Sequence, residues 1–380
     1  MNNTSFDTGS GYAHERKLES SRFGRLQWIV LFSLLALLVQ PVLSENTFID
    51  PLDAPSEMRS SPENRPLLAV ARAGESLVAV GSRGLIVYST DQGNSWTQAS
   101  VPVQSDLLAV NFPTSSEGWA VGHDGIILYS DDAGKNWVRQ LDGRLAGDVF
   151  KAFYASMGED GQAGLATIDI NYRTGPVLPW LDVWFENSLA GYVIGSYGLI
   201  ASTTDGGKNW EPGMYHVDNA EELNLNSMRT IDGNIYIAGE QGKVHKLDRA
   251  RNHFTRTDSG YLGSFFGITG GDGILLAFGI AGTIFRSADN GESWQLLETP
   301  TRQAIVAGVV RSNAEGFVLL DIAGQLLSID HSATSVNFLP IKTVLQATGI
   351  VQVKNDLFIV TGMEGIKRVE IPPYTAANIH

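Results

Sequence analysis

The amino-acid sequence predicts an all-β fold built from seven copies of one unit. A Gly-x-x-Gly step, or a close variant of it, recurs seven times between Gly81 and Gly365. Successive steps lie 40 to 44 residues apart, with one exception of 73 residues. Short β-branched and aromatic runs bounded by turn residues separate the steps, which is the pattern of β-strands. A repeat of this length is typical of a β-propeller, so we expect a seven-bladed β-propeller with four antiparallel strands per blade.

The second repeat illustrates the expected strand order. Its Gly122 to Gly125 step lies between the second and third of four short apolar runs. These runs cover residues 107–112, 119–121, 126–130 and 137–141. Each run is too short for a helix and is bounded by turn residues, so we predict four strands in this blade.

The last repeat is incomplete. Residues 348–353, 357–360 and 366–371 supply three strands, and Pro372 and Pro373 block a fourth because proline cannot donate to a strand ladder. An open ring would expose strand edges that promote aggregation. We therefore predict that residues 47–52 supply the missing outer strand and latch the ring. The alternative is a flexible N-terminal tail.

The N-terminus predicts export. Residues 1–25 are polar and carry four basic residues, and an apolar run follows at residues 28–39. This pattern is typical of a secretory signal peptide, with cleavage expected after Ser44. Because the run is shorter than the roughly 20 residues that span a bilayer, an uncleaved signal anchor is the alternative. We assign residues 1–44 to this segment, 45–66 to an extended lead-in, 67–373 to the propeller and 374–380 to a tail.

One connection is much longer than the others. From Trp137 to Leu181 the chain runs 44 residues, whereas the corresponding stretch elsewhere takes about 11. An insertion of about 33 residues, at 143–178, is therefore expected between blades 2 and 3. A long insertion in a regular array is often functional, and a tolerated surface elaboration is the alternative.

Composition excludes several classes of function. The chain has no cysteine, which rules out disulfides, cysteine-based zinc sites, thiol nucleophiles and a lipidated N-terminal cysteine. Beyond Ser44 it carries 23 Lys and Arg against 38 Asp and Glu, so a basic nucleic-acid footprint is absent. Its seven histidines are dispersed without ligand spacing. We expect no metal, no cofactor, no nucleic-acid partner and a monomer.

Four repeats carry the element Ser/Thr-x-Asp-x-Gly-x-x-Trp. Its Asp, Gly and Trp residues are Asp91, Gly93 and Trp96; Asp132, Gly134 and Trp137; Asp205, Gly207 and Trp210; and Asp289, Gly291 and Trp294. In such a turn the carboxylate accepts backbone N–H groups, glycine supplies a positive φ and tryptophan buries a large apolar face. The element is identified as the Asp-box, or bacterial neuraminidase repeat, and we expect it to hold turns rather than to bind or react.

The whole repeat resembles the photosystem II stability/assembly factor family. The resemblance is carried by residues 112–122, residues 185–195 and the Asp-boxes that follow them, and it covers residues 67–371. It implies a seven-bladed propeller that acts as a non-catalytic chaperone for a membrane protein during assembly, across the membrane from the cytosol or stroma.

Photosynthetic members of that family present an arginine-rich docking patch, and cyanobacterial members usually carry a lipidated cysteine. This chain is acidic and lacks cysteine, so we expect a member from a non-photosynthetic bacterium. We expect it to be periplasmic, or tethered to the outer side of the inner membrane if the signal is uncleaved. The expected partner is a membrane protein or membrane-protein complex, such as a transporter.

The steps also predict a binding face. Alternate connections of an up-and-down blade lie on opposite faces, so the steps, the inter-blade connections and the insertion share one face. The candidate partner-binding residues are Arg83, His123, Asp124, Tyr197, Glu240, Gln241, Ile280, Ile322, Met363 and Glu364. Polar tips on blades 1 to 4 beside apolar tips on blades 5 and 6 indicate a protein-docking surface. Alternatively, Ile280 and Ile322 fold inward and plug the channel.

A glycoside hydrolase is the alternative function, because Asp-boxes also occur in sialidases. A glycosidase needs two carboxylates about 5–10 Å apart. Asp124, Glu240 and Glu364 come from blades 2, 4 and 7, and no arginine cluster accompanies them. His123 beside Asp124 is one pair suited to proton transfer, but a histidine on a surface loop is usually solvated. We therefore predict no catalytic residues.

Overall fold

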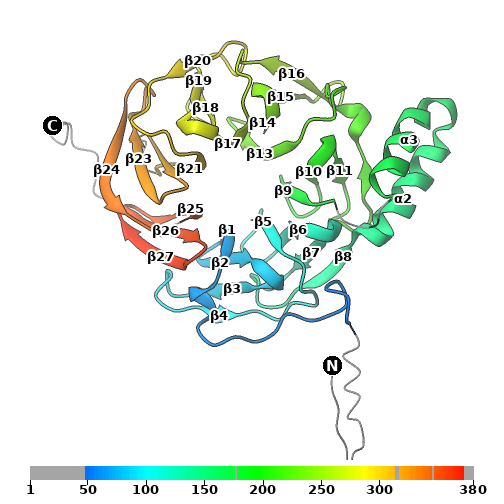
Figure 1. The fold of residues 1–380 in the computed structure, drawn as a ribbon, viewed down its shortest axis with the longest axis horizontal. Helices are drawn as coiled ribbons and strands as arrows, with labels where there is room; N and C mark the ends of the chain where they lie inside the picture. Colours follow the sequence, from blue (N-terminus) through cyan, green and yellow to red (C-terminus); the bar gives the residue numbers. More distant parts are fainter. Residues whose placement is uncertain (1–47, 174, 176–177, 313–315, 345, 372–380) are drawn as a thin grey trace, which may run out of the picture. The chain divides into compact units, whose positions relative to one another are not determined.

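The computed structural model describes residues 48–173, 175, 178–312, 316–344 and 346–371. The described residues from Ile49 onward form one compact unit, in which seven antiparallel sheets are arranged as a ring (Figure 1). The predicted signal segment, residues 1–44, and the predicted tail, residues 374–380, lie outside the described residues.

Each sheet is a meander in which consecutive strands are hydrogen-bonded. Six described sheets have four strands and the seventh has three. The strands of blades 1 to 3 are β1 (Leu67–Ala73), β2 (Ser76–Gly81), β3 (Ile86–Ser89) and β4 (Thr97–Gln98); β5 (Leu107–Asn111), β6 (Gly118–Gly122), β7 (Ile127–Ser130) and β8 (Val138–Leu141); β9 (Trp180–Phe185), β10 (Gly191–Gly195), β11 (Ile200–Thr203) and β12 (Glu211–Pro212).

The remaining blades repeat this order. Their strands are β13 (Leu225–Ile231), β14 (Asn234–Gly239), β15 (Lys243–Asp248) and β16 (His253–Asp258); β17 (Phe265–Gly271), β18 (Ile274–Gly279), β19 (Ile284–Ser287) and β20 (Gln295–Leu297); β21 (Ile305–Val310), β22 (Phe317–Asp321), β23 (Gln325–Ile329) and β24 (Val336–Lys342); β25 (Ala347–Lys354), β26 (Leu357–Gly362) and β27 (Gly365–Glu370). The predicted strands of the second and seventh repeats are confirmed within one or two residues.

The hydrophobic core lies between adjacent blades. Second strands are buried almost throughout, because both of their faces pack against neighbouring sheets. Between blades 2 and 3, for example, the buried rings of Trp119 and Phe185 stack with centroids 3.5 Å apart. First strands surround a central cavity of about 170 Å³. Each blade is thus stabilised mainly by its two neighbours.

The close approach of a neighbouring backbone carbonyl explains why the first residue of the step is glycine in most blades. A Cβ atom at Gly279 would lie 2.0 Å from the carbonyl oxygen of Ser264, and one at Gly122 would lie 2.0 Å from that of Asp106. Gly279 has an extended backbone with φ −174°, so the requirement is steric rather than conformational. In blade 6 Asp321 takes this position, and its carboxylate accepts hydrogen bonds from the backbone N–H of Gln325 and the Thr301 hydroxyl.

The third residue of the step lies in the left-handed region in five blades. These residues are Arg83, Asp124, Tyr197, Gln241 and Ala281, with φ between 51° and 58°. The glycine that follows each of them is left-handed as well. The step is therefore a fixed tight turn whose second and third side chains are the variable parts.

Turns on the opposite side are held by their own side chains. The Asp289 carboxylate accepts hydrogen bonds from the backbone N–H of Ser293 at 2.9 Å and from the hydroxyls of Ser293 and Ser287. Hydrogen bonds from Ser293 lower the pKa of Asp289 to about 2. Asp91, Asp132 and Asp205 accept hydrogen bonds from the corresponding backbone N–H and the preceding Ser or Thr hydroxyl, and at Asp132 and Asp205 an asparagine side chain replaces the second hydroxyl. Trp137 and Trp210 are buried between adjacent sheets.

The insertion between blades 2 and 3 is a helical hairpin. It contains α2 (Gly143–Ser156), the 3-10 turn η4 (Gly158–Gly161) and α3 (Gln162–Asn171), and it lies at the rim of the ring beside β11 (Figure 1). Asp142 caps α2 by accepting hydrogen bonds from the first amides of the helix. Phe150 and Tyr154 of α2 are buried in the core shared by blades 2 and 3.

The predicted N-terminal latch is wrong for the described part of that segment. The seventh sheet has the strand order β25-β26-β27, and residues 49–52 form no strand with it. Instead, Leu52 is buried in the core between blades 1 and 2, and the Pro51 carbonyl accepts a hydrogen bond from the backbone N–H of Gln104 at 2.7 Å. Burial of the apolar Leu52 side chain favours this placement, and Arg139 donates a hydrogen bond to the Leu52 carbonyl at 2.9 Å.

Ring closure uses a later part of the lead-in. A Cβ atom at Gly365 would lie 2.1 Å from the Glu63 carbonyl oxygen, and one at Gly81 would lie 2.2 Å from that of Pro66. In other blades the inter-blade connection makes these two contacts. The Thr348 hydroxyl also donates a hydrogen bond to the Leu67 carbonyl at 2.7 Å. The lead-in therefore takes the place of a connection from blade 7 to blade 1, not the place of a strand.

Replacing Gly279 by alanine should destabilise the fold by at least about 2 kcal/mol, because the new methyl group would overlap the Ser264 carbonyl. Gly271→Ala is the matched control, since its Cβ would meet nothing closer than Val310 at 3.9 Å and its φ is outside the left-handed region. The control should stay within about 1 kcal/mol of the parent. Urea unfolding measures both, and equal midpoints for the two variants would contradict the steric explanation.

Candidate docking face

The seven steps share one face with the connections between blades. The last glycine of each step packs on the connection that leads to the next blade. A Cβ atom at Gly84 would lie 1.9 Å from the Val103 carbonyl oxygen, and one at Gly242 would lie 2.2 Å from that of Tyr261. We call this side of the ring the tip face. The predicted partner-binding residues all belong to it because they all lie in the steps.

Four of the predicted residues present apolar or aromatic side chains to solvent. Tyr197 is 55% exposed, Ile280 47%, Ile322 40% and Met363 41%. The central cavity is lined mainly by residues of the first strands, and neither isoleucine is among them. Ile280 and Ile322 therefore do not plug the channel.

Leu262 is a further exposed apolar residue that was not among the predicted residues. It lies in the connection between blades 4 and 5 and is 88% exposed. Its neighbour Tyr261 donates a hydroxyl hydrogen bond to the Ile280 carbonyl at 3.3 Å, which places this loop beside the step of blade 5. In the sequence, Tyr261 and Leu262 form an apolar pair between Gly260 and Gly263, which could have indicated an exposed apolar loop. We call Leu262, Ile280, Ile322 and Met363 the apolar sector.

Three of the predicted polar residues make hydrogen bonds to the connections between blades. Asp124 accepts a hydrogen bond from the Ser105 hydroxyl at 2.6 Å, and Glu240 accepts one from the backbone N–H of Asn224 at 3.0 Å. The Arg83 guanidinium donates to Gln104 across the next connection. The other predicted polar residues, His123, Gln241 and Glu364, are exposed.

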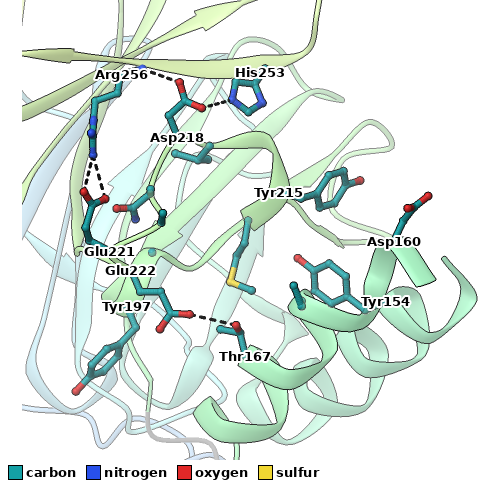
Figure 2. A pocket seen from close by; sticks show the side chains of 17 residues that line it. Tyr154, Asp160, Thr167, Tyr197, Tyr215, Asp218, Glu221, Glu222, His253 and Arg256 are labelled. Carbon is teal, nitrogen blue, oxygen red and sulfur yellow. Dashed lines mark hydrogen bonds and ion pairs between the residues drawn. The ribbon is translucent and has the colours of Figure 1, made fainter. Parts of the chain in front are cut away.

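A pocket of about 710 Å³ opens at the edge of the tip face (Figure 2). It lies between α3 and the connection from blade 3 to blade 4, residues 213–224, and it reaches β16. The residues labelled in Figure 2 line it: Tyr154, Asp160, Thr167, Tyr197, Tyr215, Asp218, Glu221, Glu222, His253 and Arg256. The insertion and the step of blade 3 thus border one cavity.

One wall of the pocket is aromatic. Tyr154 of α2 is 1% exposed and makes a T-shaped contact with Tyr215, with ring centroids 6.2 Å apart. Burial raises the pKa of Tyr154 to about 12, so its hydroxyl is a neutral donor at physiological pH. This hydroxyl approaches the Met214 backbone but completes no hydrogen bond with any described residue.

The other wall is acidic. Arg256 donates two hydrogen bonds to Glu221, at 2.9 and 3.0 Å, and these lower the pKa of Glu221. His253 lies 2.7 Å from Asp218 and lowers the pKa of that carboxyl group. Glu222 accepts a hydrogen bond from the Thr167 hydroxyl at 3.1 Å. With Asp160, the pocket holds four carboxylates against one guanidinium.

His245 lies beneath the acidic wall and is fully buried. Its Nε2 atom is 3.1 Å from the Asp218 carbonyl oxygen, so we assign the ring proton to Nε2, which donates to that acceptor. Burial lowers the pKa of His245 to about 4, so the ring is neutral at physiological pH. A neutral imidazole supports the connection that carries Asp218 without adding positive charge to the pocket.

The described residues show neither a metal site nor a membrane span. No three or more of their His, Asp and Glu side chains are grouped in a way that could hold a metal ion. None of the helices found in the described ranges has the length and apolarity needed to cross a bilayer.

This pocket could not be predicted from the sequence, although one sign of it was present. Asp218, Glu221 and Glu222 form an acidic cluster within a single inter-blade connection. Their association with α3 could not be seen, because it depends on how the insertion folds back on the ring.

Stability should fall as the pH decreases from 6.5 to about 4, because unfolded chains protonate His245 in this range and the folded protein does not. His245→Gln retains a donor for the Asp218 carbonyl and removes the titration. The free energy of unfolding of the variant, relative to the parent, should rise by about 3 kcal/mol between pH 7 and pH 4. Urea unfolding across this pH range tests the prediction, and a constant difference would refute it.

Comparison with known proteins places the chain in a family. The profile described as "Photosynthesis system II assembly factor YCF48" matches residues 68–168 and 166–295. The "Photosystem II assembly lipoprotein Ycf48" of Synechococcus sp. (strain CC9902) is 30% identical over 143 residues. That match covers 36% of this chain and 41% of the relative, so it spans about two fifths of the relative's length.

Three solved structures share the fold. "YCF48 bound to D1 peptide" matches with a TM-score of 0.60 and 19% identity over 83% of this chain and 99% of its own. YCF48 from Cyanidioschyzon merolae matches with a TM-score of 0.60 and 14% identity over the same shares. The WD40 β-propeller domain of Doa1 matches with a TM-score of 0.56 and 11% identity over 84% of this chain and 95% of its own. Since the family profile matches more than half of the sequence, this chain belongs to the family of the photosystem II assembly factor Ycf48.

Proposed function

We propose that this protein is a non-catalytic, exported β-propeller that binds a membrane-protein partner on its tip face, as an assembly, stability or accessory factor. The observation that carries the proposal is the apolar sector, whose four side chains are 40% to 88% exposed. An exposed apolar surface beside polar residues is characteristic of protein-interaction sites.

The two faces of the ring differ in a way that supports this proposal. On the face opposite the tips, four turns repeat the same internal hydrogen bonds around Asp91, Asp132, Asp205 and Asp289. We propose that these turns are Asp-boxes with a structural role only. On the tip face, equivalent positions carry side chains of different size and charge. Variation at equivalent positions suits recognition, whereas repetition suits structural support.

The family resemblance supports the same function. One related structure is described as YCF48 bound to a D1 peptide, and the cyanobacterial relative is described as a lipoprotein. This chain lacks cysteine and is acidic, so we propose a member that serves another membrane protein or complex, such as a transporter. Its predicted signal segment, residues 1–44, would place it in the periplasm or tether it to the outer side of the inner membrane.

The geometry gives little support to the glycoside hydrolase alternative. A general acid needs a raised pKa. In the pocket, Asp218 and Glu221 are paired with His253 and Arg256, and the pKa of each carboxyl group is lowered. These two carboxylates are therefore ionised at physiological pH and poorly suited to protonate a leaving group.

Substituting Leu262, Ile280 and Ile322 together with aspartate should reduce recovery of the partner at least about tenfold, because charge would replace the exposed apolar contacts. The measurement is co-purification of cross-linked membrane proteins from intact cells, quantified by mass spectrometry. The matched control is the triple aspartate variant at Val138, Leu189 and Leu296, which are 55% to 59% exposed and lie on outer strands or on the opposite face. Undiminished recovery with the tip-face variant would disprove the proposal.

A further inference from the structure

The pocket beside α3 has the chemistry of a site for a positively charged side chain. We propose that it receives the lysine or arginine side chain of an extended basic segment of the protein partner. This inference rests on the proposed function, since it specifies the chemistry of the segment that docks on the tip face.

Uncompensated negative charge is the first observation. Asp218 is hydrogen-bonded to His253, and Glu221 forms an ion pair with Arg256. Asp160 and Glu222 have no cationic partner among the described residues, and they line the pocket from η4 and from the connection between blades 3 and 4. This excess of negative charge attracts a cation to the pocket and repels an acidic segment.

The second observation is an aromatic and apolar lining that suits a long basic side chain. The ring of Tyr215 is 45% exposed and lies against the buried ring of Tyr154. Cations bind over aromatic faces, and the methylene groups of lysine and arginine pack on apolar surfaces. Met214 and Val217 line the same cavity and supply such a surface.

The third observation, a buried hydroxyl without an acceptor, favours a peptide over a simple amine as the ligand. The Tyr154 hydroxyl is neutral, lies just beneath the lining of the cavity beside the Met214 backbone and completes no hydrogen bond with any described residue. A buried donor in this state is costly, and an acceptor supplied by a ligand removes the cost. A peptide carbonyl is such an acceptor, whereas an alkyl ammonium ion has none.

The pocket is continuous with the tip face and large enough for a peptide. Tyr197 belongs to the step of blade 3 and also lines the cavity. Gly198, the next residue, packs on Asn219 of the connection that forms the acidic wall. The volume of about 710 Å³ lies within the range of about 300–1,000 Å³ that is typical of ligand sites. A segment that crosses Tyr197 can therefore place a side chain in the pocket.

The direct test uses the full-length protein and a synthetic Gly-Ser peptide that carries one arginine. The comparison probe is the same peptide with citrulline, which keeps the shape of arginine and removes its charge. Titration followed by NMR should show that the arginine peptide binds at least about tenfold more tightly, and less tightly as the salt concentration is raised. Equal binding of the two peptides would overturn the inference.

Substitutions in the pocket test whether the arginine peptide binds at this site. The double variant Asp160→Asn and Glu222→Gln should weaken binding of the arginine peptide about tenfold. Its matched control is Glu75→Gln with Asp131→Asn, which removes two exposed charges from the opposite face and should bind as the parent does. Tyr154→Phe keeps the ring and should preserve or raise stability, because it removes a buried hydroxyl without a partner. It should nevertheless weaken peptide binding several-fold, and unchanged binding by both pocket variants would overturn the inference.

Two further outcomes separate this inference from the proposed function. If cadaverine, a simple diamine, binds as tightly as the arginine peptide, the pocket is an amine site and the peptide inference fails. If the pocket variants lose the arginine peptide while the tip-face aspartate variant still recovers its partner, the inference on the pocket stands and the proposed function fails. If the peptide binds none of the proteins while the tip-face variant loses its partner, the proposed function stands and the inference on the pocket fails.

Discussion

Close approach of backbone to backbone at the glycine step is the constraint on which the rest of this structure depends. At Gly122 and Gly279 a carbonyl oxygen that immediately precedes the first strand of the same blade occupies the space that a Cβ atom would need. The last glycine of the step packs in the same way on the connection to the next blade. Each step therefore joins the entry of its own blade to the entry of the next, and these contacts bring the connections between blades to one face.

This constraint leaves two side chains per step free to vary. Because the backbone is held by glycine and by neighbouring carbonyl groups, the second and third residues contribute little to the turn itself. The third residue adopts a left-handed conformation in five blades even where it is arginine or tyrosine. A left-handed non-glycine residue is mildly unfavourable, and it persists here because the packing around the step determines the backbone. The tip face can thus carry recognition residues without loss of the fold.

Ring closure follows the same principle. Residues 63–66 repeat the contacts of an inter-blade connection at Gly365 and Gly81, so blades 7 and 1 meet as other neighbouring blades do. The described part of blade 7 has no fourth strand, and β27 is its outer strand. The exposed residues of β27 include Lys367, Arg368 and Glu370. Charged side chains on an outer strand oppose pairing with another chain, so the edge does not need to be covered.

By itself, the sequence determined the repeat, the number of blades, the position of the insertion and the face on which the tips lie. These features are local or periodic: a glycine step, an alternating strand or a tight turn is specified by residues within one unit. The exposure of Ile280 and Ile322, which the sequence left open, was decided by tertiary structure. So was the placement of Leu52, since its burial between blades 1 and 2 depends on the surface that two distant repeats form together.

The pocket was beyond the reach of the sequence for the same reason. Tyr154, Glu222 and Arg256 come from α2, a connection and β16, and their separations in sequence follow no period. Only the return of the insertion onto the ring brings Tyr154 and Asp160 to the connection that carries Tyr215 and the other three carboxylates. The sequence therefore determined where a partner could dock, because repetition fixes the face. Tertiary structure decided which chemistry that face offers, because the pocket is made by elements that do not repeat.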